Sequence, residues 1–282
     1  MPLRGRQRVV RQLFPPERLH GFSSVIRLSD GRLYDVVGDS FLEWSLLFFG
    51  PYEPEITRLL GYLVKPGNTV LDIGANVGIH TVTMAKLAGA GRVLAFEPHP
   101  QTVERLRANL ALNGIDRTEV VQVALLDRAG AVSLFDSNDS NRAMASLHAY
   151  DGWSSTSVEG MTLDDVLQVR AVPKVDVVKI DVEGFEPAVL EGARGMLARD
   201  RPALIFEYMN WAWENCGYAL ADTLQMLRDV GYRDFFTIET DRLQPLVTHL
   251  SHPANLLAVP ESTDLPLDRL QAAGSLRHQG NR

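Results

Sequence analysis

Apolar runs and glycine-bearing polar breaks alternate through the middle of the chain. Residues 69–73 form a short apolar run typical of a buried strand, and residues 74–78 form a glycine-bearing turn that starts a helix. The pattern then predicts a strand over 92–97, a helix over 100–112 and a strand over 119–123. This β-α-β-α-β order predicts a parallel sheet with right-handed crossovers.

The second half of the chain continues the alternation after a break. Its predicted elements are strands over 175–181 and 203–207, helices over 186–198 and 220–230, and a final antiparallel hairpin of strands over 235–238 and 255–259. The fold class is therefore α/β: a Rossmann-like, doubly wound, seven-stranded and mostly parallel sheet with a C-terminal antiparallel hairpin.

The break falls between the third and fourth strong strands. Residues 131–135 are expected to add a short strand, and residues 136–160 are polar, irregular and interspersed with aromatic side chains. A loop of this length in a compact domain is usually functional or disordered. We interpret it as an ordered cap over the substrate, and the alternative is a mobile surface loop. Thr162 then provides a cap for a short helix.

The N-terminal part differs from the rest. Residues 1–20 contain several arginines but no apolar core, which predicts a loose arm and argues against a signal peptide. A basic arm that touches a membrane surface or a partner is the alternative. Residues 24–37 predict a hairpin, and a helix is expected to begin near Pro54. The chain is thus divided into an N-terminal arm and β-hairpin extension (1–48), a main domain (49–260) and a polar C-terminal tail (261–282).

Composition narrows the function classes. The 282 residues carry a net charge of −7, which gives no general attraction to nucleic acid. The single cysteine, Cys216, allows no intrachain disulfide, so we expect a cytoplasmic protein. No transmembrane segment is expected, because the apolar run over 41–49 is far shorter than the roughly 20 residues that a spanning helix needs.

Four predicted strands end in an acid. In an open α/β sheet, ligands collect beyond the carboxyl ends of the strands, so these acids are expected at one edge. Crowded carboxylates repel one another, and they imply a cationic ligand, a metal or ion pairs. The acids are Asp72, Glu97, Asp181 and Glu207.

The glycine turn and its spacing to Glu97 predict a nucleotide site. Glu97 can accept hydrogen bonds from both hydroxyls of a ribose. A dinucleotide site would need a glycine where Asn76 stands, and a P-loop would need a lysine after Gly78. Weak phosphate-binding features beside many acids favour S-adenosylmethionine, with Asp72 and the turn facing its methionine end. An NAD-dependent dehydrogenase and a non-catalytic cofactor-binding assembly module are the alternatives.

Lys179 and Asp181 are expected on one face of the fourth strand, because side chains alternate along a strand. They could form an ion pair that shapes the edge. In the functional interpretation, Asp181 lies at the methyl donor and Lys179 orients or deprotonates the acceptor. The other candidate bases are His80 and His148, while His99 is interpreted as structural. Mg²⁺ held by Asp181, Glu183 and Glu207 is a metal-assisted variant.

Several motifs together resemble the FkbM family of S-adenosylmethionine-dependent methyltransferases. They are GPYEPE, VLDIGANVGIHTVTMA, AFEPHP, NLALNGI and VKIDVEGFEPAVLEGA, and the resemblance covers roughly residues 49–260. It implies O-methylation of a hydroxyl on a small-molecule or glycan acceptor: a sugar, a glycolipid or a secondary metabolite. By this resemblance, the site residues include Asp181, Glu183 and Gly184 of the family signature. The cofactor residues are Tyr52, Glu53, Asp72, Gly74, Ala75, Asn76, Gly78, Glu97, Pro98, Ala124 and Asp181, and Lys179 and Glu207 complete the catalytic set with Asp181.

Overall fold

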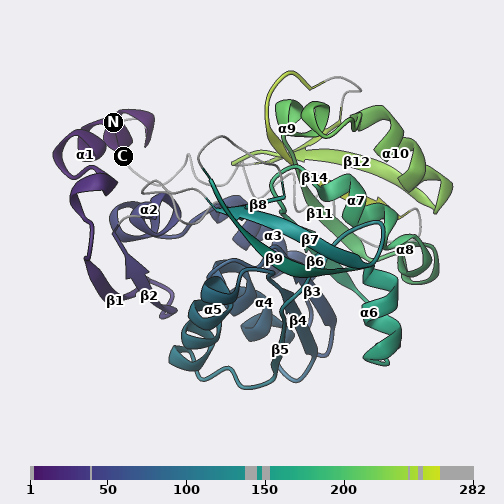
Figure 1. The fold of residues 1–282 in the computed structure, drawn as a ribbon, viewed down its shortest axis with the longest axis horizontal. Coiled ribbons are helices and arrows are strands. Elements are labelled where there is room, and N and C mark those ends of the chain that lie inside the picture. Colours follow the sequence, from purple (N-terminus) through teal and green to yellow (C-terminus); the bar gives the residue numbers. More distant parts are fainter. Residues whose placement is uncertain are drawn as a thin grey trace, which may run out of the picture.

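A central mixed sheet forms the middle layer of the molecule (Figure 1). The computed structural model describes residues 3–38, 40–136, 145–147, 153–240, 242–246 and 250–260. Within these residues the central sheet has eight strands. In spatial order they are β13 (Leu243–Pro245), β12 (Tyr232–Ile238), β14 (Ala254–Pro260), β11 (Ala203–Tyr208), β10 (Val177–Ile180), β3 (Thr69–Ile73), β4 (Arg92–Phe96) and β5 (Thr118–Val121).

The strand directions confirm the doubly wound α/β class. The strands from β11 to β5 are mutually parallel, whereas β14 runs antiparallel to both β11 and β12. The order reverses between β3 and β10, which is the switch point where ligands bind in such sheets. The expected number of strands was seven. The eighth is β13, a three-residue edge strand on β12 that is too short to leave a hydrophobic pattern in the sequence.

Alternating side chains give the sheet two apolar faces. Val70 packs with α3 and α4 on one face, and its neighbour Leu71 packs with α6, α8 and α10 on the other. The helices of the main domain are α3 (Pro54–Leu63), α4 (Ile79–Ala88), α5 (Pro100–Leu112), α6 (Leu163–Val169), α7 (Glu186–Glu191), α8 (Arg194–Asp200), α9 (Asn210–Asn215) and α10 (Leu220–Asp229). Thr162 caps α6 through its side chain, as predicted.

The helix predicted over 186–198 is two helices, α7 and α8. Asp164, on α6, explains the break, because its carboxylate accepts hydrogen bonds from the backbone amides of Gly195 (2.7 Å) and Met196 (2.8 Å) at the start of α8. A cap supplied from a distant helix leaves no local signal. Helix α9 was not predicted, since a six-residue helix is too short to show periodicity.

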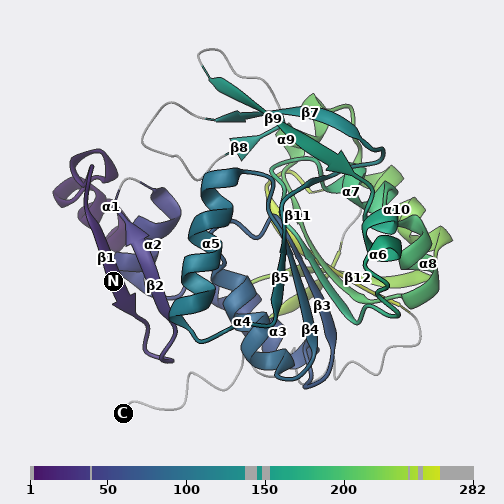
Figure 2. The same cartoon turned by 60° about the horizontal axis from the view of Figure 1, so that its bottom comes forward.

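The prediction of an irregular loop over 136–160 was wrong in part. Its second half is β9 (Ser154–Met161), which pairs with β6 (Ala124–Leu125) and β7 (Gly130–Asp136). With β8 (Ala145–Ser146) they form a separate four-stranded sheet beyond one end of the central sheet (Figure 2). The first residues of β9 are polar and exposed, so the strand lacks the expected alternation. Residues 137–144 and 148–152, including His148, lie outside the described residues.

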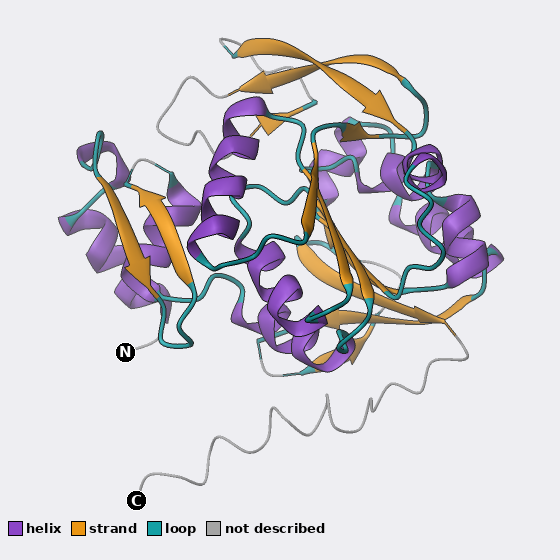
Figure 3. Cartoon of the chain, turned by 90° about the horizontal axis from the view of Figure 1, so that it is seen from below, coloured by secondary structure: helices purple, strands orange, loops and turns teal. Residues whose placement is uncertain are grey.

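Two helices and a hairpin form an N-terminal module beside α5 (Figure 3). The prediction of a loose arm over 1–20 was wrong, because this segment contains α1 (Leu3–Leu13) and the short 3₁₀ helix η1 (Pro16–Arg18). The hairpin, β1 (Ser23–Arg27) with β2 (Leu33–Val37), is confirmed, and α2 (Phe41–Phe49) follows it. Helix α1 is amphipathic but mostly polar, so its sequence contains no apolar run. The prediction of a loose arm was based on that absence.

The module shares an apolar core with the main domain. Tyr34, Val36 and Leu46 pack in one cluster with Leu106 and Leu110 of α5. The main-domain boundary near residue 49 stays a prediction, and the tail 261–282 lies outside the described residues. None of the described helices is both long and apolar enough to span a bilayer.

Candidate functional site

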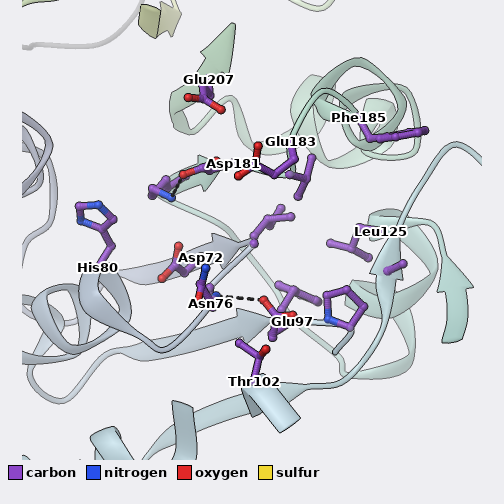
Figure 4. A pocket seen from close by; sticks show the side chains of 18 of the residues that line it. Asp72, Asn76, His80, Glu97, Thr102, Leu125, Asp181, Glu183, Phe185 and Glu207 are labelled. Atoms are coloured by element: carbon purple, nitrogen blue, oxygen red, sulfur yellow. Dashed lines mark hydrogen bonds and ion pairs between the residues drawn. The ribbon is translucent and has the colours of Figure 1, made fainter. Parts of the chain in front are cut away.

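A pocket opens at the carboxyl ends of the strands on both sides of the switch point. It encloses about 1160 Å³, including the open solvent at its mouth. Glu97 and Thr102 lie at one end, and Asp181, Glu183 and Glu207 lie at the other, with Asp72 between them (Figure 4). Of the predicted site residues, Tyr52, Asp72, Gly74, Ala75, Asn76, Glu97, Pro98, Ala124, Lys179, Asp181, Glu183 and Glu207 all line it.

The glycine turn has its shape for two different reasons. Gly74 has a φ of 78°, and a Cβ built there would lie 1.7 Å from the backbone oxygen of Asp181. The turn thus packs directly on the end of β10, and a side chain would separate the two halves of the pocket. Gly78 has a φ of 90° and faces Leu106 of α5 rather than the pocket. Gly78 therefore permits close packing of α5 and is not part of the pocket lining, and its predicted contact with the cofactor stays a prediction.

Glu97 is held in position before any ligand binds. One carboxylate oxygen accepts the backbone N–H of Asn76 at 3.0 Å, and the other accepts that of His99 at 3.0 Å. The side chain of Glu97 is buried. A carboxylate oxygen can accept more than one hydrogen bond, and the role of Glu97 toward ribose hydroxyls stays a prediction.

Asp72 offers a second acceptor in the middle of the pocket. It is fully buried, and its Oδ2 accepts the hydroxyl of Thr81 at 2.6 Å. Its Oδ1 is buried without a hydrogen-bond partner. An unsatisfied buried carboxylate oxygen is costly, and a donor on a ligand would remove that cost. Thr81, one turn into α4, was not predicted as part of the site.

Lys179 is the cation beside these acids. It is buried, and its Nζ donates to Asp181 Oδ2 at 3.1 Å. Burial alone would lower the pKa of Lys179, but the charges of Asp181, Asp72 and Glu53 outweigh burial and raise it. An ammonium that keeps its proton cannot accept one from a substrate. The charges around Lys179 therefore favour the orienting role over the deprotonating one, and either role stays a prediction.

The carboxylates around Asp181 cannot all be ionised. Burial, followed by the charge of Asp181, raises the pKa of both Glu183 and Glu207. Burial also raises the pKa of Glu186 to about 7, although the backbone N–H of Val182 works against it. Some of these carboxyl groups therefore keep their protons at neutral pH. A cationic ligand would favour the release of those protons.

A pH prediction follows for the ligand-free protein. Folded Glu207 keeps a proton that the unfolded chain loses above its usual pKa near 4.5. The folded state then binds more protons, so this group makes unfolding easier as pH rises above that value. We expect Glu207→Gln to be the more stable protein, by a margin that grows from pH ~5 to pH ~9. Urea unfolding at several pH values measures this, and a margin that does not change with pH would contradict it.

A model of the methyltransferase FkbM domain matches residues 72–233, which is more than half of the chain. The chain belongs to the FkbM methyltransferase family. The 2-O-methyltransferase NoeI of Sinorhizobium fredii is 28% identical over 161 residues, which cover 51% of this chain and 65% of NoeI. The hexuronic acid methyltransferase AglP of Haloferax volcanii is 30% identical over 149 residues, which cover 51% of this chain and 58% of AglP.

These matches include less than two thirds of the length of either relative. Among solved structures, methyltransferase FkbM of Methylobacillus flagellatus has a TM-score of 0.45 and 14% identity, and the match covers 72% of this chain and 50% of that one.

Glu53, a predicted site residue of this FkbM chain, is not part of the pocket lining but contacts His80, which is. Glu53 accepts from Asn255 Nδ2 at 2.9 Å, and its other oxygen lies 2.9 Å from His80 Nε2. These contacts join α3, α4 and β14 at the position where Tyr52 lines the pocket. Glu53 thus fixes the segment that carries Tyr52. His80 also lines the pocket, with its Nδ1 buried and unpartnered. His99 caps α5 through its side chain.

Glu186 was also not predicted as part of the site in this FkbM domain. It is fully buried at the first turn of α7. One oxygen accepts the backbone N–H groups of Val182 (2.8 Å) and Gly184 (3.3 Å), and the other accepts Trp213 Nε1 (2.8 Å). Glu186 therefore shapes the turn that carries Glu183. An acid in a first helical turn usually serves the helix itself, so the sequence pattern alone did not single it out.

Proposed function

We propose that this chain is an S-adenosylmethionine-dependent O-methyltransferase that acts on a hydroxyl of a sugar, glycolipid or secondary metabolite. The main support for this proposal is that the two ends of one pocket differ in chemistry. Glu97, with its oxygens fixed by two backbone amides, suits a ribose at one end. The Lys179–Asp181 pair and the protonated acids suit a hydroxyl acceptor at the other. Two relatives are named for methylation at a 2-O position and of hexuronic acid, which supports a glycan acceptor.

The residues of the chain divide the work between binding and proton transfer. Bound S-adenosylmethionine would supply an electrophilic methyl group. Glu97 would hold the ribose, and the free oxygen of Asp72 would meet a donor near the methionine end. Asp181 would take the proton of the acceptor hydroxyl, oriented by the ammonium of Lys179. Glu207, which keeps a proton at neutral pH, would donate a hydrogen bond to a second hydroxyl of the acceptor.

Calorimetric titration with S-adenosylmethionine, S-adenosylhomocysteine and NAD tests the cofactor. We expect binding of the first two at micromolar levels and no competition by NAD. Absence of binding would overturn the proposal, and competition by NAD would favour a dehydrogenase. A screen of glycan and small-molecule acceptors with a labelled methyl donor tests the reaction. Cofactor binding with no turnover on any acceptor would favour a non-catalytic assembly module.

Metal dependence is a separate prediction. Asp181, Glu186 and Glu207 bring carboxylate oxygens within 4.8 Å of one another, which is one geometry for a divalent cation. Both oxygens of Glu186 already accept N–H donors, so few lone pairs are left for a metal. We expect methyl transfer to be unchanged after exhaustive dialysis against EDTA. Activity that falls on chelation and returns with Mg²⁺ would show that the metal-assisted variant is right. The cytoplasmic location and the exclusion of nucleic acid stay predictions.

A further inference from the structure

The N-terminal helix differs in charge from the rest of the chain. Helix α1 (Leu3–Leu13) contains four arginines and no acid, whereas the whole chain has a net charge of −7. The first acid in the sequence is Glu17. Within α1, the side chains of Arg8 and Arg11 are exposed. A basic helix on an otherwise acidic protein favours one orientation toward an anionic surface.

Large apolar side chains are exposed on another side of α1 and at the start of α2. Val9 and Leu13 are 43% and 63% exposed, and their spacing of four residues places them on one face of α1. Phe14 and Phe41 are 50% and 41% exposed. We call this surface of the N-terminal module the Arg–Phe face. It consists of Arg8, Val9, Arg11, Leu13, Phe14 and Phe41, and on α1 the two arginines lie on one side of the helix and Val9 and Leu13 on another. Exposed apolar residues gathered in this way mark an interaction site more often than scattered ones do.

The Arg–Phe face is held together by aromatic packing. The ring of Phe14 stacks on Phe48 at 5.5 Å, and its carbonyl accepts Trp44 Nε1 at 2.7 Å. Phe41 stacks on Trp44 at 5.7 Å, with the guanidinium of Arg11 5.9 Å from its ring centre. The exposed edges are therefore fixed in place by α2 rather than carried on a free arm. Little conformational entropy would be lost when this face docks.

The chemistry of the face fits a lipid surface. A helix that lies in a bilayer interface separates its side chains by polarity, with arginines or lysines on one side and apolar or aromatic side chains on the other. Nucleic-acid backbones would use the arginines but would leave Val9 and Leu13 in water. A two-fold contact with a second copy would bring the same arginines toward one another. We propose that the Arg–Phe face docks on the surface of a bilayer that contains anionic lipids.

Docking would bring the catalytic domain to the membrane in a defined position. Phe41, on the Arg–Phe face, directly precedes Leu42, which lines the candidate active-site pocket. Helix α2 thus joins the docking face to the pocket in two consecutive residues. The inference about docking does not rest on the proposed methyl transfer, because a vesicle assay measures it without a cofactor or an acceptor.

Vesicle flotation of the full chain tests the proposal. We expect the protein to float with vesicles of phosphatidylcholine mixed with phosphatidylserine, and much less with phosphatidylcholine alone. Arg8→Glu with Arg11→Glu should weaken flotation on the order of tenfold or more, because each reversal removes an attraction to the anionic surface and adds a repulsion. Leu13→Ser with Val9→Ser should also weaken it. High salt should reduce binding of the wild type, because salt screens the attraction.

Matched variants away from the face serve as controls. Arg128→Glu with Arg194→Glu makes the same change of charge at exposed sites, and Val169→Ser removes an apolar side chain that is 80% exposed on α6. Both should float like the wild type, and all variants should show the wild-type circular dichroism. Equal flotation with neutral and anionic vesicles, or full flotation of the arginine variant, would overturn the proposal. If the chain does not bind vesicles, its retention on duplex oligonucleotides would instead indicate nucleic-acid binding. A dimer that is lost in Leu13→Ser would instead indicate a contact between two copies, and either result would overturn the proposal.

Discussion

Replacing Glu97 with alanine should weaken S-adenosylmethionine binding by about 1.5–3 kcal/mol, or roughly ten- to a hundredfold in Kd. The loss has two physical sources. The ribose hydroxyls lose a charged acceptor whose oxygens are fixed by the N–H groups of Asn76 and His99, each at 3.0 Å. Those two amides also lose their own acceptor, so the turn that shapes the pocket becomes less well defined.

Isothermal titration calorimetry measures the affinity, and a thermal melt without ligand reports the cost to the fold. Glu104→Ala is a suitable control, because Glu104 is an exposed acid on the neighbouring helix α5 and does not line the pocket. It should bind the cofactor like the wild type. An unchanged Kd in a folded Glu97→Ala protein would show that the ribose lies elsewhere and that Glu97 is a structural residue of the turn.

Glu97 could be found from the sequence because its signal is local. A buried strand, a glycine turn, a helix and a second strand that ends in an acid follow one another without interruption, and the structure has each of them within one or two residues of the predicted bounds. The central parallel strands were predictable for the same reason, since buried on both faces they form continuous apolar runs. The crossover rule gives only the hand of each connection, so the order of the strands in the sheet was not predicted.

The features that were missed depend on distant partners. Strand β9 exists because β7 and β6 pair with its backbone, while its exposed serines and threonine carry no alternation. Helix α1 is held by the aromatic cluster of α2. Glu186 is recognisable only when the amides of Val182 and Gly184 are seen to point at it. In each case the stabilising contact comes from another segment, and a single sequence does not show which segments meet.

For the acids at the strand ends, one property could be predicted from the sequence and another could not. Their crowding at one edge was predictable from the topology, and the prediction of a paired cation was sound. Which acids keep their protons was not predictable, because it depends on burial and on distances between side chains. Glu53 illustrates the point: burial would raise its pKa, but the hydrogen bond with His80 lowers it. The pKa of Glu207, at the same edge, shifts in the opposite direction.

The second large effect is expected for Lys179→Met. Removing one partner of a buried charge pair typically costs about 3–5 kcal/mol of folding free energy, and we expect the lower end of this range because the Asp181 side chain is 28% exposed. Lys179 is 3% exposed and donates to Asp181 at 3.1 Å. Without the ammonium, Asp181 loses its orienting partner, and the carboxyl group of Glu183 would hold its proton to higher pH. We expect kcat to fall by roughly 10²-fold or more, with the acid limb of the pH–rate profile moved to higher pH.

Urea unfolding and pH–rate profiles separate this role from simple loss of stability. Lys174→Met is the matched control, because Lys174 forms an exposed ion pair with Asp176 at 2.8 Å, and its removal should cost no more than about 1 kcal/mol. The double variant Lys179→Met with Asp181→Asn removes both charges of the buried pair. It should recover much of the lost stability while remaining inactive, because the base is gone. A Lys179→Met protein with wild-type kcat and an unmoved profile would show that the pair only supports the fold.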